Sequence, residues 1–246
     1  MPIPADAASA FAEDLDGKVS AAVDLLKQSV RDYGRVAYAN SLGAEAMVLT
    51  ELVWSRAPQI DVFTIDTGRL PEETYSLLEA LLRRRGSSFR VMFPDASAVE
   101  AVVSRFGVNG FYESREARLA CCRVRKVETF KRAITGYAAW VTGVRRDQSA
   151  ARARSEPVAW DAEYGLYKIS PLLDWAESDV WQYIRTRRLP YNALHDRHYP
   201  SIGCAPCTRA VNPGEGNRAG RWWWEESNVR ECGLHPVVPD SGAGRE

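Results

Sequence analysis

The stretch Val36-Ala37-Tyr38-Ala39-Asn40-Ser41-Leu42-Gly43, with the apolar-periodic segment from Glu45 to Trp54 behind it, decides the fold class. Residues 36–40 form a short apolar run typical of a buried strand, and Ser41-Leu42-Gly43 predicts a tight turn. Residues 45–54 space their apolar side chains as one face of a helix does. An amphipathic segment from Leu15 to Tyr33, ended by Gly34, predicts a further helix before the strand. The first elements are therefore a helix, a strand, a turn and a second helix.

This strand–turn–helix unit recurs along the chain. Asp61 to Asp66 predicts a second strand, and Pro71-Glu72-Glu73 predicts the start of the next helix, since proline is tolerated in a first helical turn. The further predicted elements are a strand at 89–94, a helix at 98–106, a strand at 138–143 and an edge strand at 167–169. Strands that alternate with helices predict an open, doubly wound α/β fold with a mostly parallel sheet.

Three turns follow predicted strands, at the end of the sheet where such folds bind their ligands. They are Ser41-Leu42-Gly43, Asp66-Thr67-Gly68 and Thr142-Gly143. From Asn192 the composition changes to Gly, Pro, Asn and charged residues around Trp222-Trp223-Trp224, whose rings supply an apolar means of docking. We expect one α/β domain over residues 1–211 and a mobile C-terminal segment over residues 212–246.

The composition restricts the classes of function. With 246 residues, of which 46% are hydrophobic, the chain has ample material for a buried core, which argues against a disordered protein. Its 32 Lys and Arg balance 32 Asp and Glu, and a net charge of zero argues against a nucleic-acid or anionic-membrane partner. The sequence has neither a signal-peptide pattern nor an apolar run of membrane-spanning length. We expect a soluble, cytoplasmic protein, either a monomer or a homo-oligomer.

Four of the five cysteines form two close pairs, Cys121-Cys122 and Cys204-x-x-Cys207. Four thiolates can hold structural zinc or an iron–sulfur centre. Adjacent side chains diverge, so one tetrahedral zinc would strain the backbone at Cys121-Cys122, whereas a [4Fe–4S] cluster offers each sulfur a separate iron. We therefore favour the cluster. The alternatives are unligated buried thiols and a thioredoxin-like redox pair at Cys204 and Cys207.

The fifth cysteine, Cys232, lies in the segment Glu231-Cys232-Gly233-Leu234-His235. The neighbouring glycine favours exposure, and a nearby histidine or arginine would favour the thiolate, which is the nucleophilic form. Cys232 is therefore a candidate attacking group. The alternative is an inert surface thiol.

A basic cluster lies in the middle of this neutral chain. Between Arg115 and Arg154 there are eleven Lys and Arg residues and three acidic residues. A solvated helix face accounts for some of them, but Lys126 follows Cys122 by one helical turn, and Arg145 and Arg146 follow a turn at a strand end. Guanidinium groups and turn N–H groups are suited to phosphate and sulfate oxygens. We predict a small polyanionic ligand, over which Arg218 and Arg221 close.

Together these features resemble the assimilatory adenylyl-sulfate reductase family, within the wider group of phosphoadenylyl-sulfate reductases and adenine nucleotide α-hydrolase-like folds. The resemblance covers roughly Ala37 to His235. Its most specific segments are Cys121-Cys122-Arg123-x-Arg125-Lys126, Thr142-Gly143-x-Arg145-Arg146-Asp147-Gln148-Ser149, Tyr199-Pro200-Ser201-Ile202-Gly203-Cys204-x-Pro206-Cys207-Thr208 and Glu231-Cys232-Gly233-Leu234-His235. All four occur in the order that the family shows.

The resemblance implies roles for the matching residues. In this family the two cysteine pairs bind a [4Fe–4S] cluster, and the Glu-Cys-Gly-Leu-His motif carries the nucleophile, here Cys232. Asp66-Thr67-Gly68 looks like the nucleotide-binding turn, and Ser41-Leu42-Gly43 resembles a pyrophosphatase-type loop that departs from the form in ATP-using relatives. The implied adenosine-pocket residues are Ser41, Gly43, Thr67 and Gly143. The implied phosphate and sulfate ligands are Lys126, Arg152, Arg218, Arg221 and His235, with Arg154 as the alternative to Arg152.

The implied reaction is the reduction of adenylyl sulfate to sulfite and AMP in sulfate assimilation, through a Cys232 thiosulfonate that reduced thioredoxin resolves. A reductase of 3′-phosphoadenylyl sulfate, or an enzyme that accepts both nucleotides, is the nearest alternative. Family members that use only the 3′-phosphorylated nucleotide generally lack both cysteine pairs. A non-catalytic iron–sulfur nucleotide sensor and a tRNA-thiolating enzyme are more distant alternatives. The form of the Ser41-Leu42-Gly43 loop and the zero net charge argue against the tRNA-thiolating enzyme.

Overall fold

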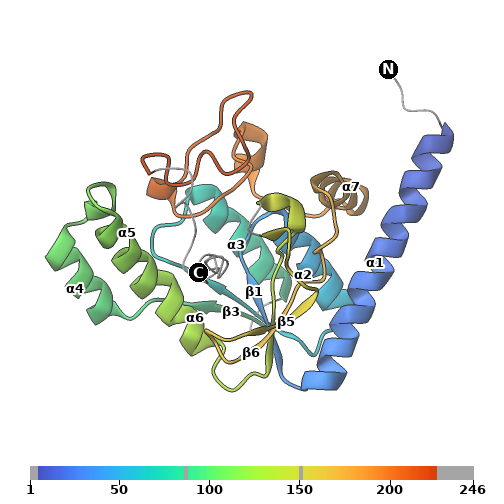
Figure 1. Ribbon diagram of the computed structural model, residues 1–246, viewed down its shortest axis with the longest axis horizontal. Coiled ribbons are helices and arrows are strands. Elements are labelled where there is room, and N and C mark those ends of the chain that lie inside the picture. The colour runs from blue at the N-terminus through green and yellow to red at the C-terminus, as the bar shows by residue number, and fades with distance from the viewer. Residues whose placement is uncertain (1–4, 86–87, 150–151, 226–246) are drawn as a thin grey trace, which may run out of the picture.

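The computed structural model describes residues 5–85, 88–149 and 152–225, with the backbone alone for residues 5–13. Its six-stranded sheet has the order β3-β2-β1-β4-β6-β5 (Figure 1). The strands are β1 (Val36–Asn40), β2 (Asp61–Ile65), β3 (Phe89–Met92), β4 (Ala139–Val141), β5 (Val158–Asp161) and β6 (Leu166–Ile169). Every neighbouring pair in this order is parallel except β5 with β6. The predicted open, mostly parallel α/β fold is confirmed.

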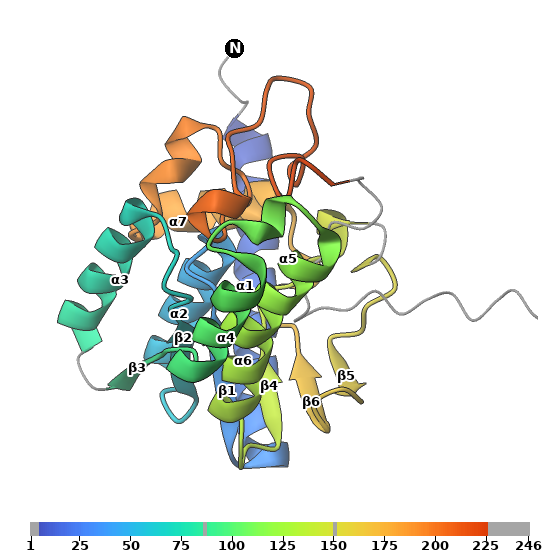
Figure 2. The ribbon, with the colours of Figure 1, turned by 90° about the vertical axis from the view of Figure 1, so that its left-hand side faces the viewer.

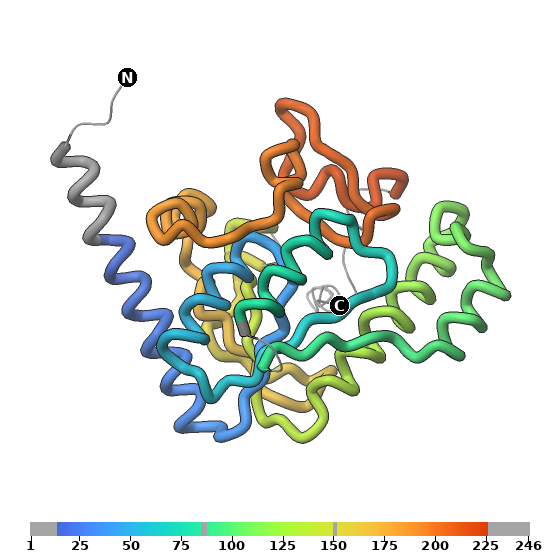
Figure 3. Tube along the Cα trace, turned by 180° about the vertical axis from the view of Figure 1, so that it is seen from behind, coloured from blue at the N-terminus to red at the C-terminus, as the bar shows by residue number. Residues whose placement is uncertain are grey.

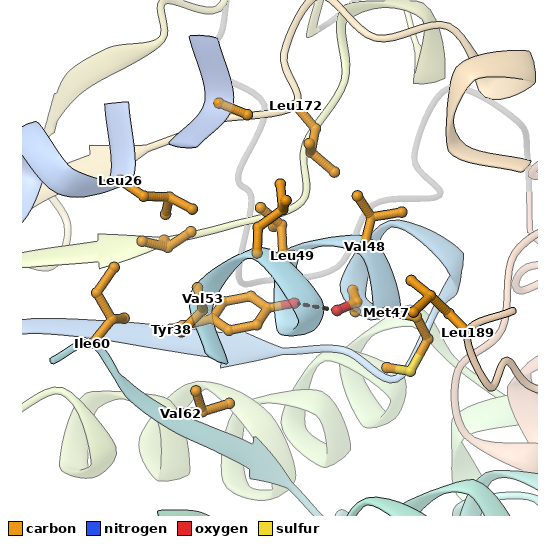
Figure 4. Close-up of a cluster of buried hydrophobic side chains, with 14 of the residues drawn as sticks. Leu26, Tyr38, Met47, Val48, Leu49, Val53, Ile60, Val62, Leu172 and Leu189 are labelled. Atoms are coloured by element: carbon orange, nitrogen blue, oxygen red, sulfur yellow. Dashed lines mark hydrogen bonds between the residues drawn. The ribbon is translucent and has the colours of Figure 1, made fainter. Parts of the chain in front are cut away.

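Helices cover both faces of the sheet. They are α1 (Ala5–Tyr33), α2 (Ala44–Arg56), α3 (Glu72–Arg85), α4 (Ala96–Phe106), α5 (Arg115–Cys122), α6 (Glu128–Ala133) and α7 (Glu177–Arg187). Buried side chains of α1, α2, α3 and α7 share one core with the sheet, part of which Figure 4 shows around Tyr38 and Leu49. On the opposite face, α6 packs Phe130 against Phe63 and Trp140. Both faces are therefore buried, as is usual for a parallel sheet.

One predicted strand has a different place in the sheet. The expected edge strand at 167–169 belongs to β6, which lies inside the sheet between β4 and β5. The edge is β5, for which the sequence pattern carried no clear signal because its four residues are only partly buried or exposed. A turn containing Gly165, with φ of 69°, joins the two strands, and Trp160 packs on Tyr167 across them. Figure 2 shows β3 and β5 at opposite edges.

The strand order reverses between β1 and β4, which are parallel neighbours at the centre of the sheet. In open α/β sheets such a reversal leaves a crevice at the carboxyl ends of the strands. After α7 the chain crosses this end of the sheet, shown in orange to red in Figures 1 and 3. It contains the short helices η6 (Ala193–Arg197) and η7 (Ala205–Cys207).

Within the described residues, no helix combines the length and the apolar character that crossing a bilayer would need.

Candidate active site

A cavity of about 300 Å³ opens at the carboxyl ends of the central strands. Its floor consists of the turns after β1 and β4 together with side chains of β2. The chain after α7, from Pro200 to Gly203 and from Asn217 to Trp222, supplies its outer wall. The cavity therefore lies at the place that the strand reversal predicts for a ligand.

The turn after β1 is held by the side chain of Asn40. Its Oδ1 accepts a hydrogen bond from the Leu42 N–H at 2.8 Å, and its Nδ2 donates to Thr50 Oγ1 at 2.7 Å. These bonds stabilise the left-handed backbone of Leu42, whose φ is 59°. Gly43 then caps α2, and residues 44–46 line the cavity. The positive end of the α2 dipole thus borders the space in which a phosphate group would be stabilised.

The turn after β4 is tied to the first turn of α2 by Arg145. This side chain is 4% exposed, and its Nε donates to Glu45 Oε1 at 3.0 Å. A second carboxylate, that of Asp147, accepts from Nη1 of the same guanidinium. Gly143 permits this approach, because a Cβ there would lie 3.1 Å from the Cβ of Glu45. Arg145 lines the cavity, but two carboxylates neutralise its charge.

Gln148 extends this network toward a second arginine. Its Nε2 donates to Glu45 Oε1 at 2.9 Å, and its Oε1 accepts from the backbone N–H of Arg145 at 3.2 Å. The same Oε1 accepts from Nη1 of Arg152. Because each polar atom of the amide has a partner, Gln148 holds the guanidinium of Arg152 relative to α2.

Three cysteines gather beside the other end of the cavity. Cys204 and Cys207 are buried with Phe111 and Trp222, and Cys121 packs against this group. Cys204 Sγ and Thr67 Oγ1 are hydrogen-bonded at 3.2 Å. The Ala205 N–H donates to the carbonyl of Arg69 at 2.8 Å. The loop that carries Cys204 and Cys207 is therefore fastened to the turn after β2.

The other cysteine pair ends α5 and leads into a π-helical turn, η3 (Arg123–Val127). Such wider turns are rare and are frequent at functional sites. Lys126, expected one α-helical turn after Cys122, lies in this π-helical turn and lines the cavity. Arg125 of the same turn donates to the carbonyl of Thr67 at 2.7 Å. The turn thus directs two cations toward the cysteines and the cavity.

The thiols have different electrostatic surroundings. Burial opposes ionisation of Cys204, but the charge of Lys126, the hydrogen bond with Thr67 and the charge of Arg221 outweigh it, so its pKa is lowered. Burial and the neighbouring Cys204 raise the pKa of Cys207 to about 12. Burial also raises the pKa of Cys121, although Arg125 opposes this shift. Negative charge on these sulfurs is thus favoured most at Cys204.

Within the described residues, no three His, Cys, Asp or Glu side chains are arranged as a complete metal-ion site. Cys121 interacts electrostatically with Cys204 and Cys207, whereas Cys122 interacts with Arg118. The two adjacent thiols therefore have different surroundings, as expected for side chains that diverge along a helix.

Arg221 enters the cavity wall from the segment after α7. It is 6% exposed, and its Nη1 donates to the carbonyl of Ile202 at 3.2 Å. A Cβ at Gly203 would lie 2.2 Å from Nη2 of Arg221, so any other residue there would displace this guanidinium from its position. The sequence motif around Cys204 therefore includes a glycine that Arg221 requires.

The structure brings together most of the residues expected at the site. Those that line the cavity are Ser41, Gly43, Thr67, Lys126, Gly143, Arg145, Arg152, Arg218 and Arg221. Cys232 and His235 lie outside the described residues. Residues 212–225, expected as the start of a mobile segment, include Trp222, which is 1% exposed.

Three expected residues do not line the cavity. Asp66 accepts hydrogen bonds from the Gly68 N–H at 2.7 Å and from the Tyr75 hydroxyl at 2.9 Å. Gly68 has a φ of 71°, so these two residues shape the turn that carries Thr67. Arg146 points away, with its Nε donating to Asp174 Oδ1 at 2.6 Å and its Nη1 donating to backbone carbonyls. Its role is to hold the loop around residue 153.

Glu45 and His195 line the cavity without having been assigned a role from the sequence. The sequence pattern indicates Glu45 only as the start of a helix, because an acid beside an expected anion site has no obvious function without its partner Arg145. His195 lines the cavity near Trp181, and its Nε2 has no hydrogen-bond partner among the described residues. Burial lowers the pKa of His195. No spacing in the sequence indicated it.

Comparison with known proteins agrees with this geometry. The sequence profile of the phosphoadenosine phosphosulfate reductase domain matches residues 35–210. An adenosine 5′-phosphosulfate reductase of Allochromatium vinosum is 52% identical over 91% of this chain and 87% of its own length. An adenosine 5′-phosphosulfate reductase of Burkholderia cepacia is 44% identical over 96% of this chain and 97% of its own length.

Solved structures show the same fold at low sequence identity. A phosphoadenylyl-sulfate reductase of Candida auris, in a phosphate complex, superposes with a TM-score of 0.66 at 23% identity, covering 86% of this chain and 99% of that one. An FMN adenylyltransferase of Candida glabrata superposes with a TM-score of 0.59 at 15% identity, covering 93% and 81%. With the profile match over most of its length and relatives of this identity, the chain belongs to the phosphoadenosine phosphosulfate reductase family.

Proposed function

We propose that this chain reduces adenylyl sulfate to sulfite and AMP in sulfate assimilation, with Cys232 as the nucleophile and reduced thioredoxin as the electron donor. The observation that carries the proposal is a single cavity that joins a strand-end nucleotide site to a cationic corner beside three cysteines. Relatives named adenosine 5′-phosphosulfate reductase, matched over most of their length, support the substrate.

The cavity lining combines two kinds of chemistry. Ser41, Gly43, Thr67 and Gly143 come from turns at strand ends, where backbone groups and the α2 dipole suit a nucleotide. Lys126, Arg152, Arg218 and Arg221 supply cationic side chains. The adenosine would lie between the central strands, and the phosphate and sulfate would contact the four cations, with His235 as a further ligand.

Reduction proceeds through a covalent intermediate on the protein. The Cys232 thiolate attacks the sulfur of adenylyl sulfate, the bond between that sulfur and the phosphate oxygen breaks, and AMP leaves. One thiolate of reduced thioredoxin then attacks Cys232 Sγ. Sulfite leaves, and a mixed disulfide between thioredoxin and Cys232 remains. The second thiol of thioredoxin resolves this disulfide and restores Cys232, so the dithiol supplies both electrons.

The chain's own cations lower the barrier of the first step. Negative charge develops on the phosphate oxygen as AMP leaves, and fixed cations in a partly buried site stabilise it without reorganising. Two observations support this role for Lys126: its side chain lines the cavity, and its charge lowers the pKa of the neighbouring Cys204. Because AMP is a good leaving group, the step needs no general acid.

The four paired cysteines fit a [4Fe–4S] cluster in their donor chemistry. Cys121, Cys122, Cys204 and Cys207 would hold it, with Thr67 and Arg125 as neighbours of the sulfurs. Hydrogen bonds and charges at the sulfurs tune such clusters. When bound, the cluster supplies a compact charged group that tunes the electrostatics of the corner. Thr67, Arg125 and Lys126 then connect this corner to the substrate cavity.

The proposal also assigns a domain boundary and a cellular compartment. We place the division between the nucleotide-binding domain and the segment that carries the nucleophile at residues 211 and 212. The use of reduced thioredoxin is consistent with a cytoplasmic enzyme, where thiols are kept reduced.

The experiment uses anaerobically purified protein. Iron and sulfide analysis should give a [4Fe–4S] content, and mass spectrometry after mixing with adenylyl sulfate should show an added sulfonate on Cys232. Cys232→Ser should bind adenylyl sulfate and form no adduct. Sulfite production by this variant at the wild-type rate would contradict the mechanism, and a colourless, zinc-loaded protein would contradict the cluster.

The second candidate substrate is 3′-phosphoadenylyl sulfate, which the name of the matched domain and of the Candida auris structure favours. The rates with the two nucleotides at equal concentration separate the candidates. A clear preference for the 3′-phosphorylated nucleotide would overturn the choice of adenylyl sulfate.

A further inference from the structure

The short segment Arg221–Glu225, here called the strap, contacts both cysteine-bearing elements. On one side, Arg221 forms an antiparallel bridge with Thr208, and the Trp222 N–H donates to the carbonyl of Cys207 at 3.3 Å. Trp222 is 1% exposed, and its left-handed backbone, with φ of 43°, is rare for a bulky residue. The strap is therefore folded tightly onto the loop of Cys204 and Cys207.

On the other side, the strap is bound to α5 by a buried ion pair. Arg118 Nε donates to Glu225 Oε1 at 2.8 Å, and Arg118 Nη2 donates to Glu225 Oε2 at 2.6 Å. The two side chains are 1% and 8% exposed. Such two-pronged pairing fixes orientation as well as distance, and burial protects it from screening by salt.

Arg118 also connects the ion pair to the cysteines. It precedes Cys122 by four residues on α5, which places the two side chains on one face of the helix. Its guanidinium interacts with Cys122 and lies 5.0 Å from the Trp222 ring. One arginine thus contacts a cysteine of the first pair and two residues of the strap.

Neither member of the ion pair belongs to the substrate cavity, since Arg118 and Glu225 are absent from its lining. Glu225 precedes Cys232 by seven residues. At about 3.5 Å per extended residue, Cys232 lies within roughly 25 Å of Glu225. The place where Glu225 is held therefore limits how far from α5 Cys232 can be.

We propose that Arg118 and Glu225 form a positioning pair that holds the start of the Cys232-bearing segment against α5 and so raises the rate at which Cys232 attacks substrate. The inference rests on the proposed function, in which Cys232 is the nucleophile. Restricting where a nucleophile starts raises its effective concentration at the reacting atom. The pair acts on the approach of Cys232 and leaves the binding of the nucleotide unchanged.

The test compares graded variants of the pair with a matched control. Glu225→Gln removes the carboxylate charge without touching Cys122, and Glu225→Asp keeps the charge on a shorter side chain. The control is Arg105→Met, which breaks the Arg105–Glu116 pair at 2.8 Å, where both side chains are 69% exposed. Three quantities are measured for each protein: iron and sulfide content, the affinity for AMP, and the single-turnover rate of the Cys232 adduct by mass spectrometry.

We expect Glu225→Gln to slow adduct formation by roughly tenfold or more while iron, sulfide and AMP affinity stay at wild-type values. Glu225→Asp should recover part of the rate, and Arg105→Met should match the wild type. A wild-type rate in Glu225→Gln overturns the inference. So does loss of the cluster or of AMP affinity in parallel with the rate, because the pair would then have only a structural role. If the wild-type protein itself forms no adduct, the proposed function fails instead.

Discussion

Two walls of the cavity both contain cationic side chains but differ in what surrounds those cations. The carboxylate-paired wall consists of Glu45, Arg145, Asp147 and Gln148, where two acidic groups neutralise Arg145. The thiol-facing wall consists of Thr67, Lys126 and Arg221. These residues lie beside Cys204, and the two cations lower the pKa of this buried thiol. The difference shows that a basic cluster in a sequence is not one functional unit. The cation next to carboxylates holds two turns of the cavity together, and the cations next to a thiol favour its thiolate form.

The largest expected effect comes from the thiol-facing wall. Cys204→Ser replaces the buried cysteine on which the cations act, and a serine hydroxyl does not ionise near neutral pH or replace a thiolate ligand. Turnover of adenylyl sulfate should fall by about 10³-fold or more, together with loss of bound iron and sulfide. Sulfite release and iron content are the measurements. Full activity in the variant would show that the reaction does not require Cys204.

Lys126→Met should have the next largest effect. It keeps the length and apolar body of the side chain but removes the charge, so kcat/KM should fall by about 10²-fold, as for loss of one preorganised electrostatic contact. The matched control is Lys131→Met, whose side chain is 51% exposed and lies 3.6 Å from Glu163. Equal losses in the two variants would mean that only the overall charge of this region matters.

A smaller effect is expected in the carboxylate-paired wall. Gln148→Leu breaks the link between Glu45 and Arg152, so KM for adenylyl sulfate should rise by about tenfold, as for loss of a partly buried hydrogen bond. In Gln148→Glu a second carboxylate would face Glu45, so the rise should be larger. A double variant with Arg152→Lys tests whether Gln148 acts through Arg152, because two changes that act through the same side chain do not have additive effects on KM. Strict additivity would contradict the positioning role of Gln148.

The smallest effect concerns the loop that leads to the strap. Arg209 and the Asn212 N–H lower the pKa of Glu215 from 4.5 to about 2. A carboxyl group with a lowered pKa in the folded protein adds stability above its unfolded pKa, and this stability is lost as the pH falls from 4.5 to about 2. The two side chains of the pair are 33% and 31% exposed, and solvent screening weakens such a pair, so Glu215→Gln should lower Tm at pH 7 by only about one or two degrees.

The control for this last prediction is the same comparison in acid. The difference in Tm between wild type and Glu215→Gln should shrink as the pH falls from 4.5 through about 2, because Glu215 then takes up a proton and becomes uncharged like glutamine. A difference that persists at low pH would show that the Glu215 contacts do not depend on its charge.

Much of the fold follows from local pattern. The strand at 36–40 and the helix after it are strongly periodic, so the structure differs from the expectation only by one or two residues at the helix ends. The edge at β5 was missed, because short, half-exposed strands show their alternation only once a partner such as β6 is beside them. The cavity position followed from strands that alternate with helices, since parallel strands present their carboxyl ends together.

The candidate site was only partly predictable. Motifs indicated Lys126, Arg152 and Arg221, which do line the cavity. They also indicated Arg146, which points to Asp174, because spacing alone cannot tell on which side of a turn a side chain leaves. The partnership of Glu45 with Arg145 joins residues a hundred positions apart, and no local pattern contains it.

The sequence by itself determined the α/β class, the strand ends at which a ligand would bind and the division of the cysteines into four paired and one single, because these depend on periodicity, turn chemistry and spacing. Only the tertiary structure decided which cations are neutralised by carboxylates and which face thiols. It alone showed the buried Arg118–Glu225 pair. The physical reason is that burial and charge pairing arise between segments distant in sequence, and these two quantities set how strongly a charged group acts.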